Sequence, residues 1–224
     1  TMFPQSATAL ASSDICLKQY DTHFSYSEVA RISHQLARYL EAEGYRAVAV
    51  PAGIPLDMSD DKVGMAGAID WRKAAGESGL ASRGKSGLAV NRRFGPRFRL
   101  GGLITTAELK PDEKLDFSPC DNCELCVESC PVGALLGEGQ IIDKKRCREH
   151  ALSYGLRAFA QLLVDVATAK DKSSAKEVIH TYRTRELWQA LETGNYYYCW
   201  TCLASCPVGK THPEVAAKTT RAGR

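Results

Sequence analysis

Residues 120–131 read CDNCELCVESCP, and this stretch decides the structure of the chain around it. Its cysteines follow the spacing Cys-x2-Cys-x2-Cys-x3-Cys-Pro, which is typical of bacterial ferredoxins. Two-residue spacers let a tight loop turn three sulfur atoms to one side, as a [4Fe–4S] cluster requires. Zinc also binds Cys-x2-Cys pairs, but it typically uses two separated pairs rather than a four-cysteine run that closes in Cys-Pro. The run therefore predicts an iron–sulfur site.

A shortened copy of this run lies near the end of the chain. Residues 199–207 read CWTCLASCP, which is the same spacing without its first cysteine, and Tyr196 stands in that place. The residues around the last cysteine repeat as well, because Ser-Cys-Pro-Val-Gly occurs at 129–133 and again at 205–209. This internal repeat predicts a pseudo-symmetric module with two clusters.

The number of cysteines sharpens this prediction. The chain has nine, an odd number that excludes complete pairing in disulfides. Two four-iron clusters need eight thiolates, and the two runs supply seven. Cys147 lies between the runs and Cys16 lies far from both, so we predict Cys147 as the eighth ligand. The alternative is a three-iron second cluster that leaves Cys147 free.

In two-cluster ferredoxins, the last cysteine of a run binds the other cluster. Crossed ligation of this kind predicts two ligand sets, which are Cys120, Cys123, Cys126 and Cys206 for one cluster, and Cys130, Cys147, Cys199 and Cys202 for the other.

The composition is that of a globular protein, with 44% hydrophobic and 25% charged residues in 224. No apolar run approaches the roughly 20 residues that cross a bilayer, so we expect no membrane association. The first residues lack the features of a signal peptide, which together with oxygen-sensitive clusters favours the cytoplasm. A start at Thr1 leaves room for a removed leader. The net charge of +3 does not by itself indicate nucleic-acid binding.

The charges are unevenly spread along the sequence. Residues 72–99 contain eight basic residues and one acid, whereas residues 111–130 contain six acids and one base. The basic block could face an anion, and the acidic stretch would suit a basic redox partner.

Hydrophobic periodicity and turn residues predict an α+β chain. We expect residues 1–20 to form a loose arm and residues 110–119 to form a linker. The predicted helices are 27–43, 70–77, 145–169 and 175–191, and the predicted strands are 47–50, 88–91 and 98–105. The linker divides the chain into a mixed portion at 1–110 and an iron–sulfur portion at 111–224.

Residues 79–86, GLASRGKS, fit the pattern of a phosphate-binding loop. A true loop of this kind follows a buried strand and opens a helix, whose N–H groups meet the phosphates. Here a predicted helix precedes the motif and a predicted strand follows it, so we reject nucleotide hydrolysis. The glycines are better explained by a backbone turn or by close approach to a bound group.

Several segments, taken in order, resemble the family of epoxyqueuosine reductases and corrinoid-dependent reductive dehalogenases. They are AAGESGL at 74–80, GKSGL at 84–88, RFGPRFRL at 93–100, Thr105 and then the cysteine run. Family members share this motif order, and they have a shortened second cysteine run with an extra cysteine upstream. The resemblance covers about residues 25–210 and supports Cys147 as a ligand.

The resemblance implies a nitroreductase-like α/β portion, here shortened, that holds a cobalamin, followed by a ferredoxin-like portion with two [4Fe–4S] clusters and inserted helices. A flavin is the alternative cofactor. On this basis the expected cofactor-binding residues are Gly79, Gly84, Lys85, Ser86, Gly87, Arg93, Gly95, Pro96 and Arg97. No motif identifies a catalytic residue.

Three functions follow from this resemblance. The first is a reductase in which the clusters feed a corrinoid that dehalogenates a small molecule or reduces an epoxide. Its electron donor would be a ferredoxin or a flavodoxin, and a homodimer could complete the cofactor pocket. The second is a non-catalytic carrier or corrinoid-reducing partner protein. The third is epoxyqueuosine reduction on tRNA. The basic block at 72–99 favours this function.

Overall fold

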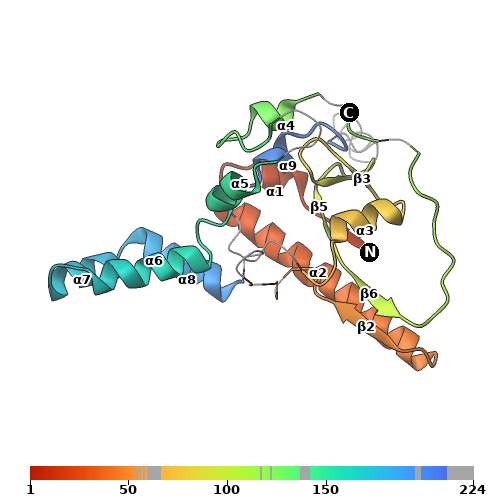
Figure 1. The fold of residues 1–224 in the computed structure, drawn as a ribbon, viewed down its shortest axis with the longest axis horizontal. Coiled ribbons are helices and arrows are strands. Elements are labelled where there is room, and N and C mark those ends of the chain that lie inside the picture. The colour runs from red at the N-terminus through yellow and green to blue at the C-terminus, as the bar shows by residue number, and fades with distance from the viewer. Residues whose placement is uncertain are drawn as a thin grey trace, which may run out of the picture.

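The computed structural model describes residues 1–53, 55, 57, 59, 67–116, 118–121, 123–136, 142–194 and 198–210. Tyr196 and the tail beyond residue 210 lie outside this part of the chain. Helices and short strands alternate in the first half and helices dominate the second, which confirms the predicted mixture of helix and sheet (Figure 1).

In the described part of the chain, the strands form three small antiparallel pairs. They are β1 (Met2–Pro4) with β5 (Phe98–Leu100), β2 (Ala47–Val50) with β6 (Gly102–Thr105), and β3 (Ser82–Arg83) with β4 (Ala89–Val90). The long helix α2 (Ile15–Ala42) packs against the first two pairs (Figure 1). The short helix α3 (Trp71–Glu77) is capped by Asp70, whose Oδ1 accepts hydrogen bonds from the N–H groups of Arg72 and Lys73 at 3.1 Å.

The predicted strand at 98–105 is divided at Gly101. A Cβ atom at this position would lie 3.2 Å from both Ser33 Oγ and Val29 Cγ2 of α2. The chain therefore passes close to the helix here, and β5 and β6 pair with different strands. The predicted strand at 47–50 and helix at 70–77 agree with the structure, and the strand expected at 88–91 is the short β4.

The prediction of a loose arm at residues 1–20 was wrong. These residues form β1, the helix α1 (Ala7–Ala11) and the first turns of α2. Ser6 caps α1 by accepting from Ala9 N–H, and Asp14 caps α2 by accepting from Cys16 N–H at 2.7 Å. Leu10 is fully buried against Trp200 and Leu203, so a distant part of the chain stabilises this segment.

Helix α2 begins twelve residues before the predicted start at Ser27. The prediction missed these turns because the buried face of the helix is unusually polar. Its buried residues recur at helical spacing, and they are Thr22, Ser25, Val29, Ser33 and Ala37. Thr22 Oγ1 accepts hydrogen bonds from Gln5 Nε2 at 3.0 Å and from Trp200 Nε1 at 2.8 Å. Hydroxyl groups with hydrogen-bond partners inside the protein can be buried at little cost. Because they are polar, a search for apolar residues at helical spacing does not detect the helix.

The second half contains six helices in the described residues, two of them short and bearing cysteines. They are α4 (Leu125–Glu128), α5 (Lys144–Ala151), α6 (Leu156–Ala167), α7 (Lys172–Ile179), α8 (Tyr182–Glu192) and α9 (Thr201–Ser205). Each predicted long helix is in fact two. The first is interrupted between α5 and α6, and the second before Thr181, which caps α8 by accepting from Thr184 N–H at 3.2 Å. Helices α6–α8 project from the rest of the molecule (Figure 1). Within the described residues, no helix is both long and apolar enough to cross a bilayer.

Leu10 tests the packing of the N-terminal segment on α9. We expect Leu10→Ala to destabilise the fold by about 2–5 kcal/mol, because it leaves a cavity against Trp200 and Leu203. Leu17→Ala, at a position that is 52% exposed on the neighbouring helix, should change stability by less than about 0.5 kcal/mol. Anaerobic urea unfolding of both variants measures the difference. Equal, small effects would show that the N-terminal segment does not pack as described.

Candidate metal centre

The first cysteine run forms a loop that leads into α4. Ser118 Oγ accepts a hydrogen bond from Cys120 N–H at 3.2 Å, and Asp121 Oδ1 accepts one from Cys123 N–H at 3.1 Å. Glu124 then adopts a left-handed backbone conformation with φ 63°, which is uncommon for a residue other than glycine. This sharp turn starts the helix that carries Cys126. None of the supporting residues Ser118, Asp121 and Glu124 was singled out in the sequence, although Ser and Asp two residues before a backbone donor are a known turn signal.

The second run repeats this structure. Helices α4 and α9 carry Cys126 and Cys202 at equivalent places and pack against each other. The repeated serines meet where they touch, with the hydroxyl groups of Ser129 and Ser205 2.9 Å apart. The repeated glycines, Gly133 and Gly209, have φ of 56° and 70°. The sequence repeat is therefore a structural repeat, with the two Cys-Pro turns side by side.

One group of thiols combines the first run with the end of the second. Burial raises the pKa of Cys126, and the charges of Cys120, Cys206 and Cys123 raise it further. Burial also raises the pKa of Cys206, where Val208 N–H and Arg97 act in the opposite direction and Cys120 and Cys123 add to the rise. A pocket that is partly open to solvent is lined by these four cysteines, with Lys85 and Ser86 at its edge.

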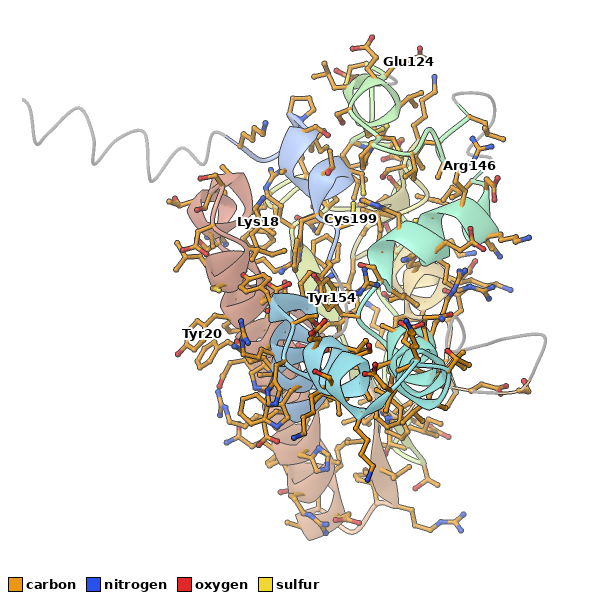
Figure 2. The ribbon with its side chains drawn as sticks, turned by 90° about the vertical axis from the view of Figure 1, so that its left-hand side faces the viewer. Lys18, Tyr20, Glu124, Arg146, Tyr154 and Cys199 are labelled. Atoms are coloured by element: carbon orange, nitrogen blue, oxygen red, sulfur yellow. The ribbon has the colours of Figure 1, made fainter. Side chains whose placement is uncertain are left out.

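A second group of thiols gathers beside the first. Burial raises the pKa of Cys147, and the charges of Cys199 and Cys130 raise it further. Burial also raises the pKa of Cys202 to about 12, with contributions from Cys199, Cys147, Cys126 and Cys130. Figure 2 shows Cys199 between α9 and α5, the helix that carries Cys147. Cys16 is exposed on α2 and lies in neither group.

The thiol of Cys130 differs from its neighbours. Burial raises its pKa, but the N–H groups of Val132, Ala134, Leu135 and Gly133 lower it more in total, so that the pKa lies below its usual value. The N–H of Ala134 is 3.2 Å from the sulfur atom. Backbone donors that surround a sulfur atom stabilise the thiolate, which is the form that binds metals.

Across the described residues, no three His, Cys, Asp or Glu side chains approach as closely as a single metal ion requires. Cys120, Cys123, Cys126 and Cys206 line one pocket, whereas Cys147 and Cys202 are carried by α5 and α9.

The glycine-rich segment at 79–87 lies against the first cysteine run. Lys85 N–H is 3.5 Å from Cys120 Sγ, and the Lys85 ammonium forms an ion pair with Glu124. Ser86 is buried and lines the same pocket, and Gly84 packs beside Cys120. Gly79 and Gly87 approach other parts of the protein, namely the backbone of Glu113 and the side chain of Ile142. The motif forms the hairpin β3–β4 and opens no helix, unlike a phosphate-binding loop.

The turn at 93–97 lies against the second cysteine run. Gly95 has φ 60° and packs on the carbonyl of Val208, and a Cβ atom at Gly209 would lie 2.5 Å from Gly95 N. Arg97 is only 2% exposed and donates to the carbonyl oxygens of Leu203, Cys206 and Val208. Sequence reasoning grouped this turn with a cofactor pocket, and it could not have identified a contact with residues more than 100 positions away.

Comparison with known proteins agrees with this centre. Residues 113–136 match the 4Fe-4S binding domain family. The chain is 37% identical over 81 residues to the epoxyqueuosine reductase of Lactococcus garvieae (strain Lg2), a match that covers 36% of this chain and 22% of that protein. It is 31% identical over 117 residues to a tetrachloroethene reductive dehalogenase of Desulfitobacterium hafniense, which covers 51% of this chain and 19% of that protein.

The chain is thus similar in sequence to both groups of reductases. The fold agrees, since the solved catabolic reductive dehalogenase NpRdhA, in complex with 3-bromo-4-hydroxybenzoic acid, superposes with a TM-score of 0.55 at 15% identity, over 91% of this chain and 30% of that one. The resemblance that the motif order indicated is thereby confirmed. The chain spans about a fifth of the length of the Lactococcus garvieae and Desulfitobacterium hafniense reductases.

Substitution of Cys147 tests most sharply whether the second thiol group binds a cluster. We expect anaerobically reconstituted Cys147→Ala to lose the cluster at that group and to fall from about eight to about four iron atoms per chain. Cys16→Ala, which removes the exposed cysteine, should keep the full iron and sulfide content. Iron and sulfide analysis decides, and retention of eight irons in Cys147→Ala would rule out Cys147 as a ligand.

Proposed function

We propose that this chain is part of an iron–sulfur reductase that passes electrons through two [4Fe–4S] clusters to a corrinoid. The observation that carries the proposal is the gathering of eight thiols from three separate parts of the sequence into two neighbouring groups. The similarity to two kinds of reductase supports an enzyme rather than a carrier alone.

The proposed ligand sets follow the two groups. Cys120, Cys123, Cys126 and Cys206 would hold one cluster, and Cys130, Cys147, Cys199 and Cys202 the other. The donor set fits these clusters, because soft thiolate sulfur is the ligand that they require. When bound, they supply single-electron transfer at low potential. The chain contributes N–H donors to the sulfur atoms at Cys120 and Cys130, and it holds Cys202 half-buried on α9.

We assign residues 1–110 to a shortened nitroreductase-like portion and residues 111–224 to the ferredoxin-like portion. The corrinoid would lie against the surface formed by 79–87 and Arg93. This position is supported by the contacts of Lys85, Ser86 and Gly84 with the first thiol group, which leave a short path for electrons between cluster and cofactor. Gly95, Pro96 and Arg97 are buried and would act through the second cysteine run, whereas Arg93 is exposed. When bound, a reduced corrinoid supplies the nucleophile or reductant for an epoxide or a carbon–halogen bond.

The proposed partners of the reductase are argued from its charge and its proposed fold. The six acids at 111–130 lie before or within the first cysteine run in sequence, and they suit a basic docking face on the electron donor, for which we propose a ferredoxin or a flavodoxin. A second copy of the chain would complete the cofactor pocket, because nitroreductase-like folds often share sites across subunits. We place the reductase in the cytoplasm, where low-potential clusters are protected from oxygen.

The cofactor can be tested on protein purified without oxygen. We expect it to contain iron and sulfide and to bind added cobalamin at micromolar concentration, followed by its optical spectrum. Lys85→Gln should weaken this binding about tenfold if its ammonium meets a phosphate, the equivalent of about 1.4 kcal/mol. Lys18→Gln, on α2, is the matched control and should bind normally. A bound flavin, or no corrinoid binding at micromolar concentration, would contradict the corrinoid assignment.

Epoxyqueuosine reduction on tRNA is the second candidate function. The Lactococcus garvieae relative, at 37% identity, favours it, as does the basic block at 72–99. On this hypothesis tRNA binds at low salt, and its affinity falls steeply with salt as counterions are released. Arg72→Gln should lower the salt slope by about one, as expected for one lost phosphate contact. Absence of tRNA binding at 50 mM salt would remove this candidate.

A non-catalytic electron carrier is the third candidate. The acidic stretch at 111–130 is compatible with it, since such a carrier needs only a docking face for its partner. Turnover of an epoxide or organohalide by the chain and a chemical reductant, with no partner enzyme present, would exclude it.

A further inference from the structure

Arg97 is a buried cation with an unusual set of partners. Its side chain is almost fully enclosed, and its guanidinium donates to the main-chain oxygens of Leu203 at 3.1 Å, of Cys206 at 2.9 Å and of Val208. All three acceptors lie on α9 or on the Cys-Pro turn that follows it. Within the described part of the chain, no carboxylate lies within ion-pair distance of Arg97.

A buried guanidinium needs a compensating negative charge. Arginine does not lose its proton in proteins, and burial of an unpaired charge is costly. Carbonyl dipoles supply part of the compensation. The Cys206 thiol can carry a full negative charge, it belongs to a residue whose carbonyl oxygen Arg97 binds, and it interacts electrostatically with the guanidinium. A cation in this place therefore favours negative charge on the first thiol group.

We propose that Arg97 is a positioning residue that fixes the turn of Cys206 and raises the midpoint potential of the cluster on Cys120, Cys123, Cys126 and Cys206. The proposal rests on the proposed function, since it requires a cluster at this group. Four thiolates and a [4Fe–4S]2+ core carry a total charge of −2, which becomes −3 when one electron is taken from a low-potential donor. No proton moves, and Arg97 keeps its charge, so that it stabilises the reduced state more than the oxidised one.

The surrounding backbone holds Arg97 in this position. Gly95 and Gly209 approach so closely that side chains at either place would collide with the other turn. The turn at 93–97 is thereby fixed against the turn at 206–209, and the guanidinium has no room to swing away.

The repeat provides an internal comparison. In the first run the corresponding turn is contacted by Arg146, whose Nη1 donates to Gly133 O at 3.2 Å. The side chain of Arg146 is 55% exposed and forms an ion pair with Asp143 at 3.6 Å. Figure 2 labels Arg146 near the helix α5 that carries it. Water and a carboxylate screen this charge, so Arg146 should have little influence on the cluster at Cys130. The turn that follows Cys206 therefore has a buried positive charge beside it, and the equivalent turn that follows Cys130 has an exposed one.

Redox titration of anaerobically purified protein tests the proposal, with titanium(III) citrate as reductant and paramagnetic resonance as readout. The Cys126→Ser variant, which changes one ligand, identifies the signal of the cluster near Arg97. We expect Arg97→Gln to shift the equilibrium of this cluster about tenfold toward the oxidised state, which is about 59 mV for one electron. Arg97→Lys should restore most of the potential, and Arg146→Gln should change either equilibrium by less than about twofold.

The outcomes separate the inference from the proposed function. Absence of a cluster at this group in the unaltered protein would remove the proposed function itself. Clusters with an unchanged potential in Arg97→Gln would overturn the inference alone. If Arg97→Gln fails to load iron, Arg97→Lys decides. If Arg97→Lys loads iron and its cluster keeps the potential of the unaltered protein, the charge of Arg97 has the proposed role. If Arg97→Lys does not load iron, or if its cluster has a lowered potential although the cation is retained, Arg97 only holds the turn of Cys206 in place.

Discussion

The contact between the hydroxyl groups of Ser129 and Ser205 joins two Cys-Pro turns that are 76 residues apart in sequence, and the placement of both thiol groups depends on it. Each turn ends one short helix and directs its last cysteine toward the sulfur atoms of the other run. If the turns were separated, each of the two thiol groups would lose one of its four cysteines, Cys206 from the first and Cys130 from the second. The inserted helices α5–α8 must therefore return the chain to its starting point, and most of their length projects outside this contact (Figure 1). A long insertion between two fixed points is tolerated because the entropic cost of closing a loop grows slowly with its length.

The second cysteine run packs against the N-terminal portion of the chain. Trp200 follows Cys199 directly, and its indole N–H reaches Thr22 on α2, while Leu203 packs on Leu10. Arg97 holds the end of the same run by three carbonyl oxygens. The first run is held differently, by the hairpin β3–β4 and the ion pair between Lys85 and Glu124. Segments from both halves of the sequence thus set the positions of the thiols.

Local features of the fold were predictable and distant ones were not. The cysteine runs, the strand at 47–50 and the helix capped by Asp70 are each specified by a few consecutive residues. The start of α2 was missed because Thr22 and Ser25 occupy its buried face and find their partners on other segments. Two long helices were predicted where there are four, since apolar spacing continues across the interruptions before α6 and at Thr181. The place of Arg97 depends on a contact with Leu203, 106 residues away, and no pattern in one sequence reveals such a contact.

Mössbauer and paramagnetic resonance spectra of 57Fe-labelled protein, purified without oxygen, test most directly the claim that two crossed sets of four thiols bind two clusters. About eight irons per chain, all in [4Fe–4S] environments, are expected, with reduced signals that broaden through magnetic interaction between neighbouring clusters. A single four-iron cluster, a three-iron second cluster or bound zinc in place of iron would contradict it.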